Sequence, residues 1–217
     1  GSVFHRQGWV RFRPTLTRGD AERVEALRRV HFRRRLDEQS EFFARLFWAI
    51  INYVLPEGWT GRVSEYRPTR HGTSPIVARV VDSAGVLHDF VTPAIDAQMR
   101  AGPPTVTADR LQELAALRYV VQRSNAPLLL VCPEKFIIHD QYGKHHDDWD
   151  GVMIEIGDGG VWLTITEGKN LRHRSANERR AFKQLKETRD LLRRRHRLRY
   201  RRKRIPGIGA YIRLSLQ

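Results

Sequence analysis

The sequence of 217 residues has one cysteine, no apolar run long enough to cross a bilayer, and far fewer acidic than basic residues. A single cysteine, Cys132, excludes a disulfide framework and any cysteine-rich zinc site. A membrane-spanning helix needs about 20 consecutive apolar residues, and no secretory signal is visible. We therefore predict a cytoplasmic protein without a membrane segment, in which Cys132 is a core residue.

The excess of positive charge is the strongest compositional signal. Lys and Arg number 39 against 24 Asp and Glu, a formal net charge of +15, and hydrophobic residues make up 41%, enough for a core. A field of this sign attracts polyanions, and nucleic acid is the leading candidate partner, DNA rather than RNA. An anionic membrane surface is the rival, but no basic helix with a wide apolar face stands out. A homo-oligomer or a partner subunit stays open.

The stretch from Trp149 to Asn170 predicts a β-hairpin. Asp158-Gly159 lies between two β-branched and aromatic runs, and this dipeptide favours a tight type I′ turn with positive φ angles. If this dipeptide is the turn centre, the register follows. It pairs Ile156 with Val161, Ile154 with Leu163, and Val152 with Ile165. The next pair is then Asp150 with Glu167.

Because side chains alternate along a strand, these six apolar residues share one face with Asp150, Glu167 and Lys169. Opposed Cβ atoms lie roughly 4.5 to 5.5 Å apart, and two carboxylates that close repel unless a cation lies between them. Oxygen ligands suit Mg²⁺ or Mn²⁺, and no cluster of softer ligands is present. The pattern indicates a divalent metal site with Lys169 beside it.

These residues resemble the PD-(D/E)XK nuclease superfamily, which includes restriction-type and repair nucleases. Asp150-Gly151, an apolar strand, a short turn and a strand ending in Glu167-Gly168-Lys169 carry the resemblance, over about a quarter of the chain. It implies that Asp150 and Glu167 bind Mg²⁺, that the Gly168 carbonyl completes the shell, and that Lys169 orients or activates the attacking water. The family's Pro before the Asp is replaced here by Trp149.

Three alternatives accompany this interpretation. The pair of Glu167 and Lys169 can be an ordinary solvated pair at the end of a surface hairpin. Asp147 and Asp148 replace Asp150 if the register slips. Glu155 points to the other face in the predicted register, so we expect a structural role for it.

Residues 1–104 predict a helical and β-hairpin extension packed on the core. The spacing of apolar residues favours helices from Asp20 to about Leu36 and from about Asp37 to Leu55. Short β-rich runs follow over 62–66, 76–81 and 86–91, the last two joined by a turn.

Residues 105–217 predict an α/β catalytic core. A helix is expected over 108–122, a buried strand over 128–132, and an extension of the sheet at 136–138. After the hairpin, a capping box of Ser175 and Glu178 begins a helix to about His196, and 210–216 alternates like a strand. The order of helix, three strands, helix and strand matches a restriction-endonuclease-like core. By the same resemblance, Glu113 is a further metal ligand and Gln184 a polar residue of the active site; each also fits an exposed helix residue.

The densest basic charge follows the hairpin. We expect contacts to nucleic-acid phosphates from Arg172, Arg174, Arg179, Arg180, Lys183, Lys186, Arg193 and Arg194. A helix face that is only solvated explains these residues poorly, because like charges at helical spacing repel each other. The basic run continues to Arg204. Ile205–Gly209 resembles the hairpin of helix-hairpin-helix modules, but the alternation after Gly209 favours a strand. His145-His146 has no further ligands for zinc, and a flexible loop is expected there.

The sequence thus predicts a metal-dependent nuclease, an endonuclease or exonuclease, in restriction, antiviral defence or repair. The main alternative is a basic nucleic-acid-binding module without catalysis, or an inactive nuclease fold in a larger complex. A third alternative is a subunit that is inactive until a partner domain acts on it.

Overall fold

The computed structural model describes residues 36–63, 75–102, 104–169, 174–193 and 199–216. These residues form a mixed α/β fold of four helices and two antiparallel sheets. The expected helix from Asp20 falls outside the described residues. No helix in the described part of the chain is long and apolar enough to cross a membrane.

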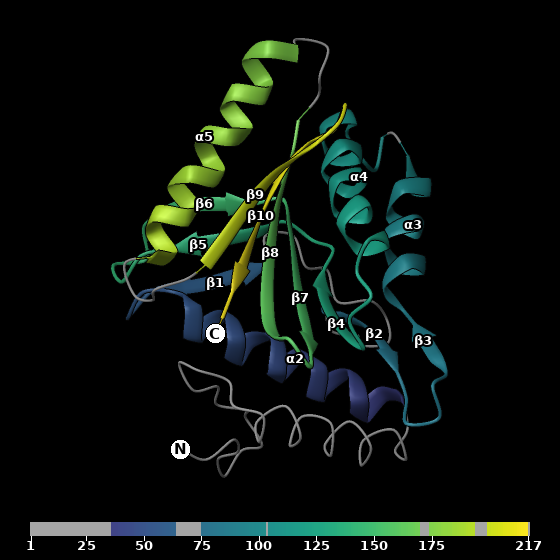
Figure 1. The fold of residues 1–217 in the computed structure, drawn as a ribbon. Coiled ribbons are helices and arrows are strands. Elements are labelled where there is room, and N and C mark those ends of the chain that lie inside the picture. Colours follow the sequence, from purple (N-terminus) through teal and green to yellow (C-terminus); the bar gives the residue numbers. More distant parts are fainter. Residues whose placement is uncertain (1–35, 64–74, 103, 170–173, 194–198, 217) are drawn as a thin grey trace.

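A seven-stranded sheet forms the centre of the fold (Figure 1). Its strands, in spatial order, are β3 (Leu87–Asp89), β2 (Val77–Val81), β4 (Leu128–Cys132), β7 (Gly151–Gly157), β8 (Gly160–Gly168), β10 (Gly209–Ser215) and β9 (Arg199–Ile205). Each neighbouring pair is antiparallel. Since β2 pairs with β4, strands from both halves of the chain share this sheet.

A second, three-stranded sheet lies beside the first. It has the order β1 (Thr60–Val63), β5 (Phe136–His139) and β6 (His145–Trp149). Two expectations were wrong here. Residues 136–138 pair with β1 and β6 instead of extending the central sheet, and His145-His146 belongs to β6 instead of a flexible loop. Phe136 and Trp149, whose rings stack 5.7 Å apart, explain the pairing of β5 with β6 because together they bury two large aromatic side chains.

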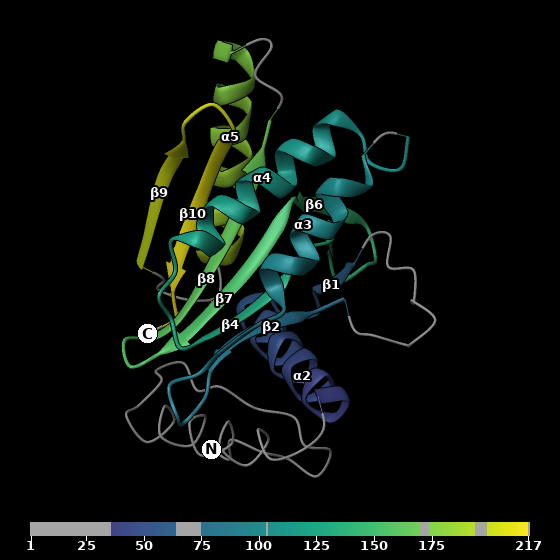
Figure 2. The ribbon, with the colours of Figure 1, turned by 90° about the vertical axis from the view of Figure 1, so that its right-hand side faces the viewer.

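Four helices cover the two faces of the central sheet (Figure 2). They are α2 (Leu36–Val54), α3 (Val91–Ala101), α4 (Ala108–Gln122) and α5 (Arg174–Arg193). One core cluster contains residues of α2 and α5, among them Phe47 and Leu185. The other contains residues of α3 and α4, among them Ile95 and Leu117. The layers are therefore α2 and α5, then the sheet, then α3 and α4.

Helix α3 was not predicted from the sequence. Its start is marked by Asp89, whose Oδ1 accepts hydrogen bonds from the backbone N–H groups of Val91 and Thr92 at 2.9 and 3.0 Å. An acceptor at this place satisfies N–H groups that have no partner inside the helix. Helix α4 has the expected bounds, and Thr107 caps it through Arg110.

The predicted register of the β7–β8 hairpin is confirmed. Val152 lies opposite Ile165, Ile154 opposite Leu163, and Ile156 opposite Val161. All six side chains are buried in the core cluster shared with α2 and α5. The turn itself differs from the prediction: Asp158 and Gly159 lack positive φ angles, and Gly160 instead has φ of 101°. A glycine after the turn thus provides the left-handed residue, so a type I′ turn is not needed.

The chain after the hairpin also differs from expectation. Helix α5 begins at Arg174, so Ser175 lies inside the helix rather than at its cap, and α5 ends at Arg193. The basic run then enters a strand, β9, which pairs with β10. Pro206 and Gly207, the latter with φ of 72°, form the turn between them. The predicted strand after Gly209 is confirmed.

Candidate functional site

The two carboxylates singled out in the sequence lie at one end of the central sheet. The register of β7 and β8 pairs Gly151 with Thr166, so that Asp150 and Glu167 come next, at the end away from the β7–β8 turn. Both are buried, with exposed fractions of 3% and 2%. A buried carboxylate is costly unless a cation or hydrogen bonds compensate it, so this pair is a candidate site.

Gly168 connects the two strands at this point. Its backbone N–H donates a 3.0 Å hydrogen bond to Oδ2 of Asp150. The absence of a side chain at Gly168 is required, because a Cβ atom there would lie 2.6 Å from the backbone nitrogen and Cα of Glu113 on α4. The Glu-Gly-Lys spacing therefore places helix α4 directly against the end of β8.

Lysine side chains provide the counter-charge. Lys169 Nζ forms an ion pair with Glu167 Oε1. Lys135, between β4 and β5, has Nζ 3.7 Å from Asp150 Oδ1, 3.7 Å from Asp148 Oδ2 and 4.0 Å from Glu113 Oε1. Each carboxylate of the pair thus has its own ammonium group.

Glu113 lies at the edge of this cluster. Its Oε2 accepts a 2.7 Å hydrogen bond from Arg110 Nη1, and the same nitrogen donates to the backbone carbonyl of Asp150 at 3.1 Å. Arg110 also donates to the carbonyl of Pro133. Arg110 therefore ties α4 to the segments carrying Asp150 and Lys135, and holds Glu113 beside them.

The electrostatics of the site follow from burial and from like charge. Burial, and then the charges of Glu167 and Glu113, raise the pKa of Asp150 well above its usual range, against the opposing effect of Lys169 and Lys135. Burial likewise raises the pKa of Glu167, with Lys169 acting against it. Burial is the largest cause of both shifts, so two charged carboxylates are costly here, and a cation between them would reduce that cost.

The alternative acids of the sequence have other partners. Asp147 Oδ2 accepts hydrogen bonds from Trp149 Nε1 at 3.0 Å and from Thr188 Oγ1 of α5 at 2.5 Å. Asp148 lies beside Lys135 and His145. Glu155 points to the opposite face, as expected from the register.

Gln184 lies one helical turn before Thr188 on α5. Its Oε1 is buried and has no hydrogen-bond partner among the described residues. The side chain is half-buried, so it is not the freely exposed glutamine that the sequence also allowed. An inward-facing amide on this helix is available to a polar group near the sheet.

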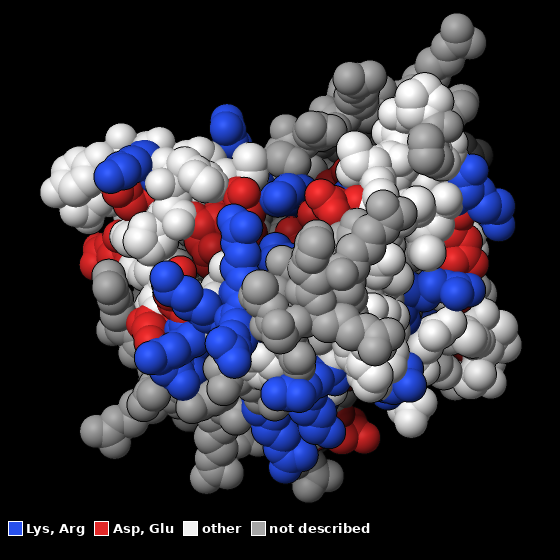
Figure 3. Space-filling model, turned by 90° about the horizontal axis from the view of Figure 1, so that it is seen from above, with Lys and Arg blue, Asp and Glu red and all other residues white. Residues whose placement is uncertain are grey.

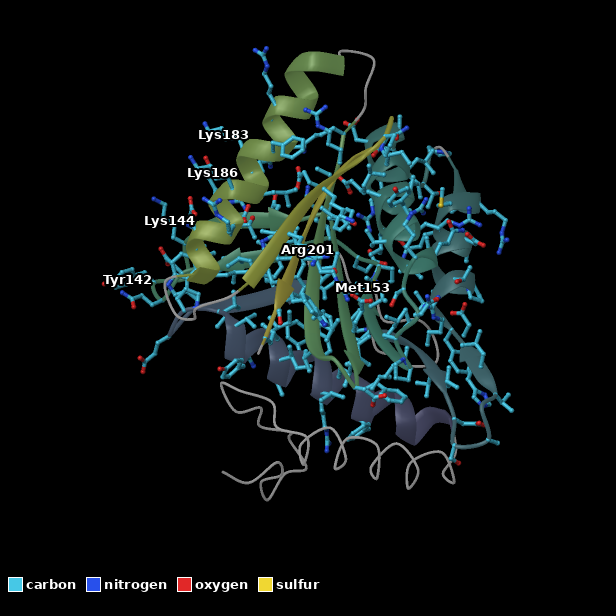
Figure 4. All side chains as sticks on the ribbon, in the orientation of Figure 1. Tyr142, Lys144, Met153, Lys183, Lys186 and Arg201 are labelled. Carbon is cyan, nitrogen blue, oxygen red and sulfur yellow. The ribbon has the colours of Figure 1, made fainter. Side chains whose placement is uncertain are left out.

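The basic face of α5 is only partly described. Arg179, Arg180, Lys183 and Lys186 are exposed, and Lys183 and Lys186 point away from the sheet (Figure 4). The backbones of Arg174 and Arg193 belong to α5, and their side chains are not described. Arg172 and Arg194 lie outside the described residues.

Seen from above, Asp and Glu side chains gather in the upper middle of the molecule, with Lys and Arg side chains near them (Figure 3). The strand ends that carry the carboxylate pair point toward this side. The described residues contain no group of three His, Cys, Asp or Glu side chains arranged around one ion position. Asp150 and Glu167, with the Gly168 carbonyl and water, would offer a metal a donor set of oxygens that suits Mg²⁺ or Mn²⁺.

Sequence reasoning missed Arg110 and Lys135. Arg110 has a local signal, since it precedes Glu113 by three residues on one helix and such residues are neighbours. Lys135 has none, because its place depends on how the chain passes from β4 in the central sheet to β5 in the second sheet.

No protein-family model matches the chain, and comparisons with curated proteins and with solved structures give no match.

Proposed function

We propose that the protein is a metal-dependent nuclease that hydrolyses phosphodiester bonds of nucleic acid, DNA rather than RNA. The observation that carries this proposal is the pair of buried carboxylates, Asp150 and Glu167, on adjacent strands beside Lys169. Burial and mutual repulsion raise the pKa of Asp150, and a divalent cation between the two groups would remove that repulsion.

The order of elements supports a restriction-endonuclease-like core. Helix α4, strands β4, β7 and β8, helix α5 and strand β10 follow one another in the expected sequence. The hairpin of β5 and β6 is an insertion between β4 and β7, and β9 is an insertion before β10. The resemblance of the Asp150 and Glu167-Gly168-Lys169 motif to PD-(D/E)XK nucleases supports the same core.

Each residue then has a defined task. Asp150 and Glu167 would hold the cation, and the N–H of Gly168 fixes the rotamer of Asp150 through Oδ2. When bound, Mg²⁺ or Mn²⁺ polarises the scissile phosphate and lowers the pKa of the attacking water. Lys169, which pairs with Glu167, would orient that water and stabilise the developing negative charge. Exposed Arg and Lys residues of α5 hold the phosphate backbone.

The test is cleavage of labelled plasmid, single-stranded DNA and RNA with Mg²⁺ or Mn²⁺, and with EDTA. Glu167→Gln and Lys169→Met keep side-chain size and remove the proposed roles. Glu57→Gln and Lys144→Met, at exposed positions away from the site, are the matched controls. Cleavage that needs metal and is lost only in the first two variants supports the proposal. Equal cleavage by all four variants contradicts it.

A second candidate is a nucleic-acid-binding module without catalysis. The observation that favours it is that Lys135 and Lys169 already provide counter-charge for the two carboxylates. In that case the cluster stabilises the sheet end, and salt-sensitive binding without metal is the whole activity. Tight binding retained in Glu167→Gln and Lys169→Met, with no cleavage of any substrate, supports this candidate.

A further inference from the structure

The face of the central sheet opposite α2 and α5 carries exposed side chains on β9, among them Arg201, which Figure 4 labels. The register places Lys203 opposite Tyr211, and Arg201 opposite Arg213, so these four side chains share that face. Arg201 and Lys203 are exposed, while Tyr211 and Arg213 are half-buried. One aromatic and three basic side chains thus share a partly exposed sheet surface.

A cavity of about 520 Å³ lies on this face, between the end of α4, the β7–β8 turn and β10. Trp162 and Tyr211 contribute aromatic rings to its lining, and Arg123, Lys203 and Arg213 contribute positive charge. Sites for small organic ligands have this size and this combination of apolar surface with a few polar groups. The cavity is at the turn end of the hairpin, away from Asp150 and Glu167 and on the other face of the sheet.

The cavity wall is held in place by buried polar contacts. Glu155, with an exposed fraction of 6%, accepts a 2.6 Å hydrogen bond from Ser124 Oγ and a 2.8 Å hydrogen bond from Arg213 Nε. The guanidinium carbon of Arg213 lies 4.2 Å from the centroid of the Trp162 ring. Glu155 therefore fixes Arg213, and Arg213 fixes the indole.

Among the described residues, a buried polar atom of the lining lacks a partner. Thr164 lines the cavity and has an exposed fraction of 1%, and its Oγ1 makes no hydrogen bond to any described residue. A buried hydroxyl without a partner is unfavourable, so a ligand atom or a water molecule at the cavity floor would stabilise it.

We propose that this cavity binds one nucleotide unit, with the base against Trp162 and Tyr211 and the phosphate at Lys203 and Arg123. An aromatic base gains from stacking on these rings, and the cations compensate its phosphate. The inference rests on the proposed function only in taking nucleic acid as the partner. The nucleotide is either a free mononucleotide or an unpaired nucleotide of a strand whose backbone follows Arg201 and Lys203.

The experiment measures binding in EDTA, so that no cleavage occurs. The probes are the four nucleoside monophosphates, a labelled single-stranded oligonucleotide, its duplex, and an oligonucleotide of equal length made of abasic units. We expect the single strand or a monophosphate to bind more tightly than the abasic strand. Preference for the strand alone identifies an unpaired nucleotide, and saturable binding of a monophosphate identifies a free nucleotide.

Three variants test the lining. Tyr211→Leu and Trp162→Leu remove stacking and are expected to weaken binding about tenfold. Lys203→Gln, at an exposed position, leaves folding unaffected and is expected to reduce the salt dependence of strand binding by about one phosphate contact. Lys144→Gln, at the tip of the β5–β6 turn, is the matched control and leaves binding unchanged.

Equal binding of the abasic and normal strands, or unchanged binding in folded Tyr211→Leu and Lys203→Gln proteins, overturns the inference. The two proposals fail separately. Glu167→Gln tests cleavage and leaves binding at this cavity intact, whereas Tyr211→Leu tests the cavity and leaves the carboxylate pair intact. Nucleotide binding without any cleavage contradicts only the proposed function.

Discussion

The backbone N–H of Gly168 donates a 3.0 Å hydrogen bond to Oδ2 of Asp150, and so joins the two strands that carry the candidate site. This bond fixes the carboxylate of Asp150 next to Glu167 at the end of the hairpin. The same glycine lets α4 approach the strand, because Glu113 occupies the space that a side chain would need. One residue therefore sets both the rotamer of Asp150 and the position of α4.

Substitution of Gly168 by alanine is expected to destabilise the protein by about 1 to 3 kcal/mol, the usual range for forcing a methyl group into a closely packed site. The added Cβ would lie 2.6 Å from backbone atoms of Glu113, which cannot move without shifting α4. Gly159→Ala is the control, since its Cβ would meet only Trp162 Nε1 at 4.0 Å. Urea unfolding of both variants measures the difference, and equal stabilities would contradict the packing of α4 on β8.

The Asp150→Asn variant is expected to be more stable than the wild type at pH 7 in EDTA. Burial and the charges of Glu167 and Glu113 raise the pKa of Asp150 in the folded protein, so the folded state holds the proton more tightly than the unfolded chain. Stability therefore falls as pH rises from the unfolded pKa, about 3.9, through the folded pKa. Thermal unfolding should show a higher Tm for the Asp150→Asn variant than for the wild type at pH 7. The difference in Tm should disappear near pH 3.

A lower Tm for Asp150→Asn at pH 7 would contradict this prediction. It would show that the lysines stabilise the Asp150 carboxylate by more than burial destabilises it. Tm values should be measured at several pH values in the same salt, because exposed charges elsewhere also titrate.

The Lys135→Met variant is expected to be less stable than the wild type at neutral pH. Burial lowers the pKa of Lys135, but the net pKa is raised by nearby carboxylates, which belong to Asp150, Glu113, Asp148 and Glu167. Its charge therefore stabilises the fold below the unfolded pKa of about 10.4, and this stabilisation is lost as pH rises through the folded pKa. Since the side chain is partly exposed, solvent screening limits the loss to about 1 kcal/mol.

A double-mutant cycle separates this contribution from lost packing. The effect of Lys135→Met should shrink in the Asp150→Asn background, because one of its partners is then neutral. Lys144→Met is the control for loss of a positive charge alone. Equal effects of Lys135→Met in both backgrounds would contradict a direct interaction between Lys135 and Asp150.

The thiol of Cys132 is expected to be unreactive in the folded protein. It is fully buried in the core, and burial raises its pKa to about 12. The thiolate is the reactive form, so labelling by a disulfide reagent at pH 8 should require unfolding. Because the chain has one cysteine, the labelling rate across a urea series reports opening of β4 directly. Rapid labelling in native buffer, at the rate of the unfolded chain, would contradict the buried position.

The hairpin could be predicted from the sequence because its determinants are local. Alternation of apolar residues in β7 and β8 fixes which face is buried, and a slip of one residue would turn the whole apolar set toward the other face. This constraint placed Asp150 opposite Glu167. The type of turn was wrong because Gly160, just outside the predicted dipeptide, provides the positive φ angle.

Features that depend on tertiary contacts could not be predicted. The run from Arg199 to Arg204 follows the predicted helix as a basic segment for which no strand was predicted, yet it becomes β9 because β10 offers a strand edge for pairing. Residues 136–138 have strand character either way, and tertiary contacts, such as packing of Phe136 on Trp149, place them in the smaller sheet. Lys135 reaches the site for the same reason, through the turn from β4 into that sheet.

Calorimetric titration of Mn²⁺ into the metal-free protein tests the central claim most directly. The account predicts saturable binding to one site, strongly weakened in Asp150→Asn and in Glu167→Gln and retained in Glu155→Gln, whose carboxylate lies on the other face of the sheet. No binding, or equal binding by all these proteins, would contradict a metal site formed by Asp150 and Glu167.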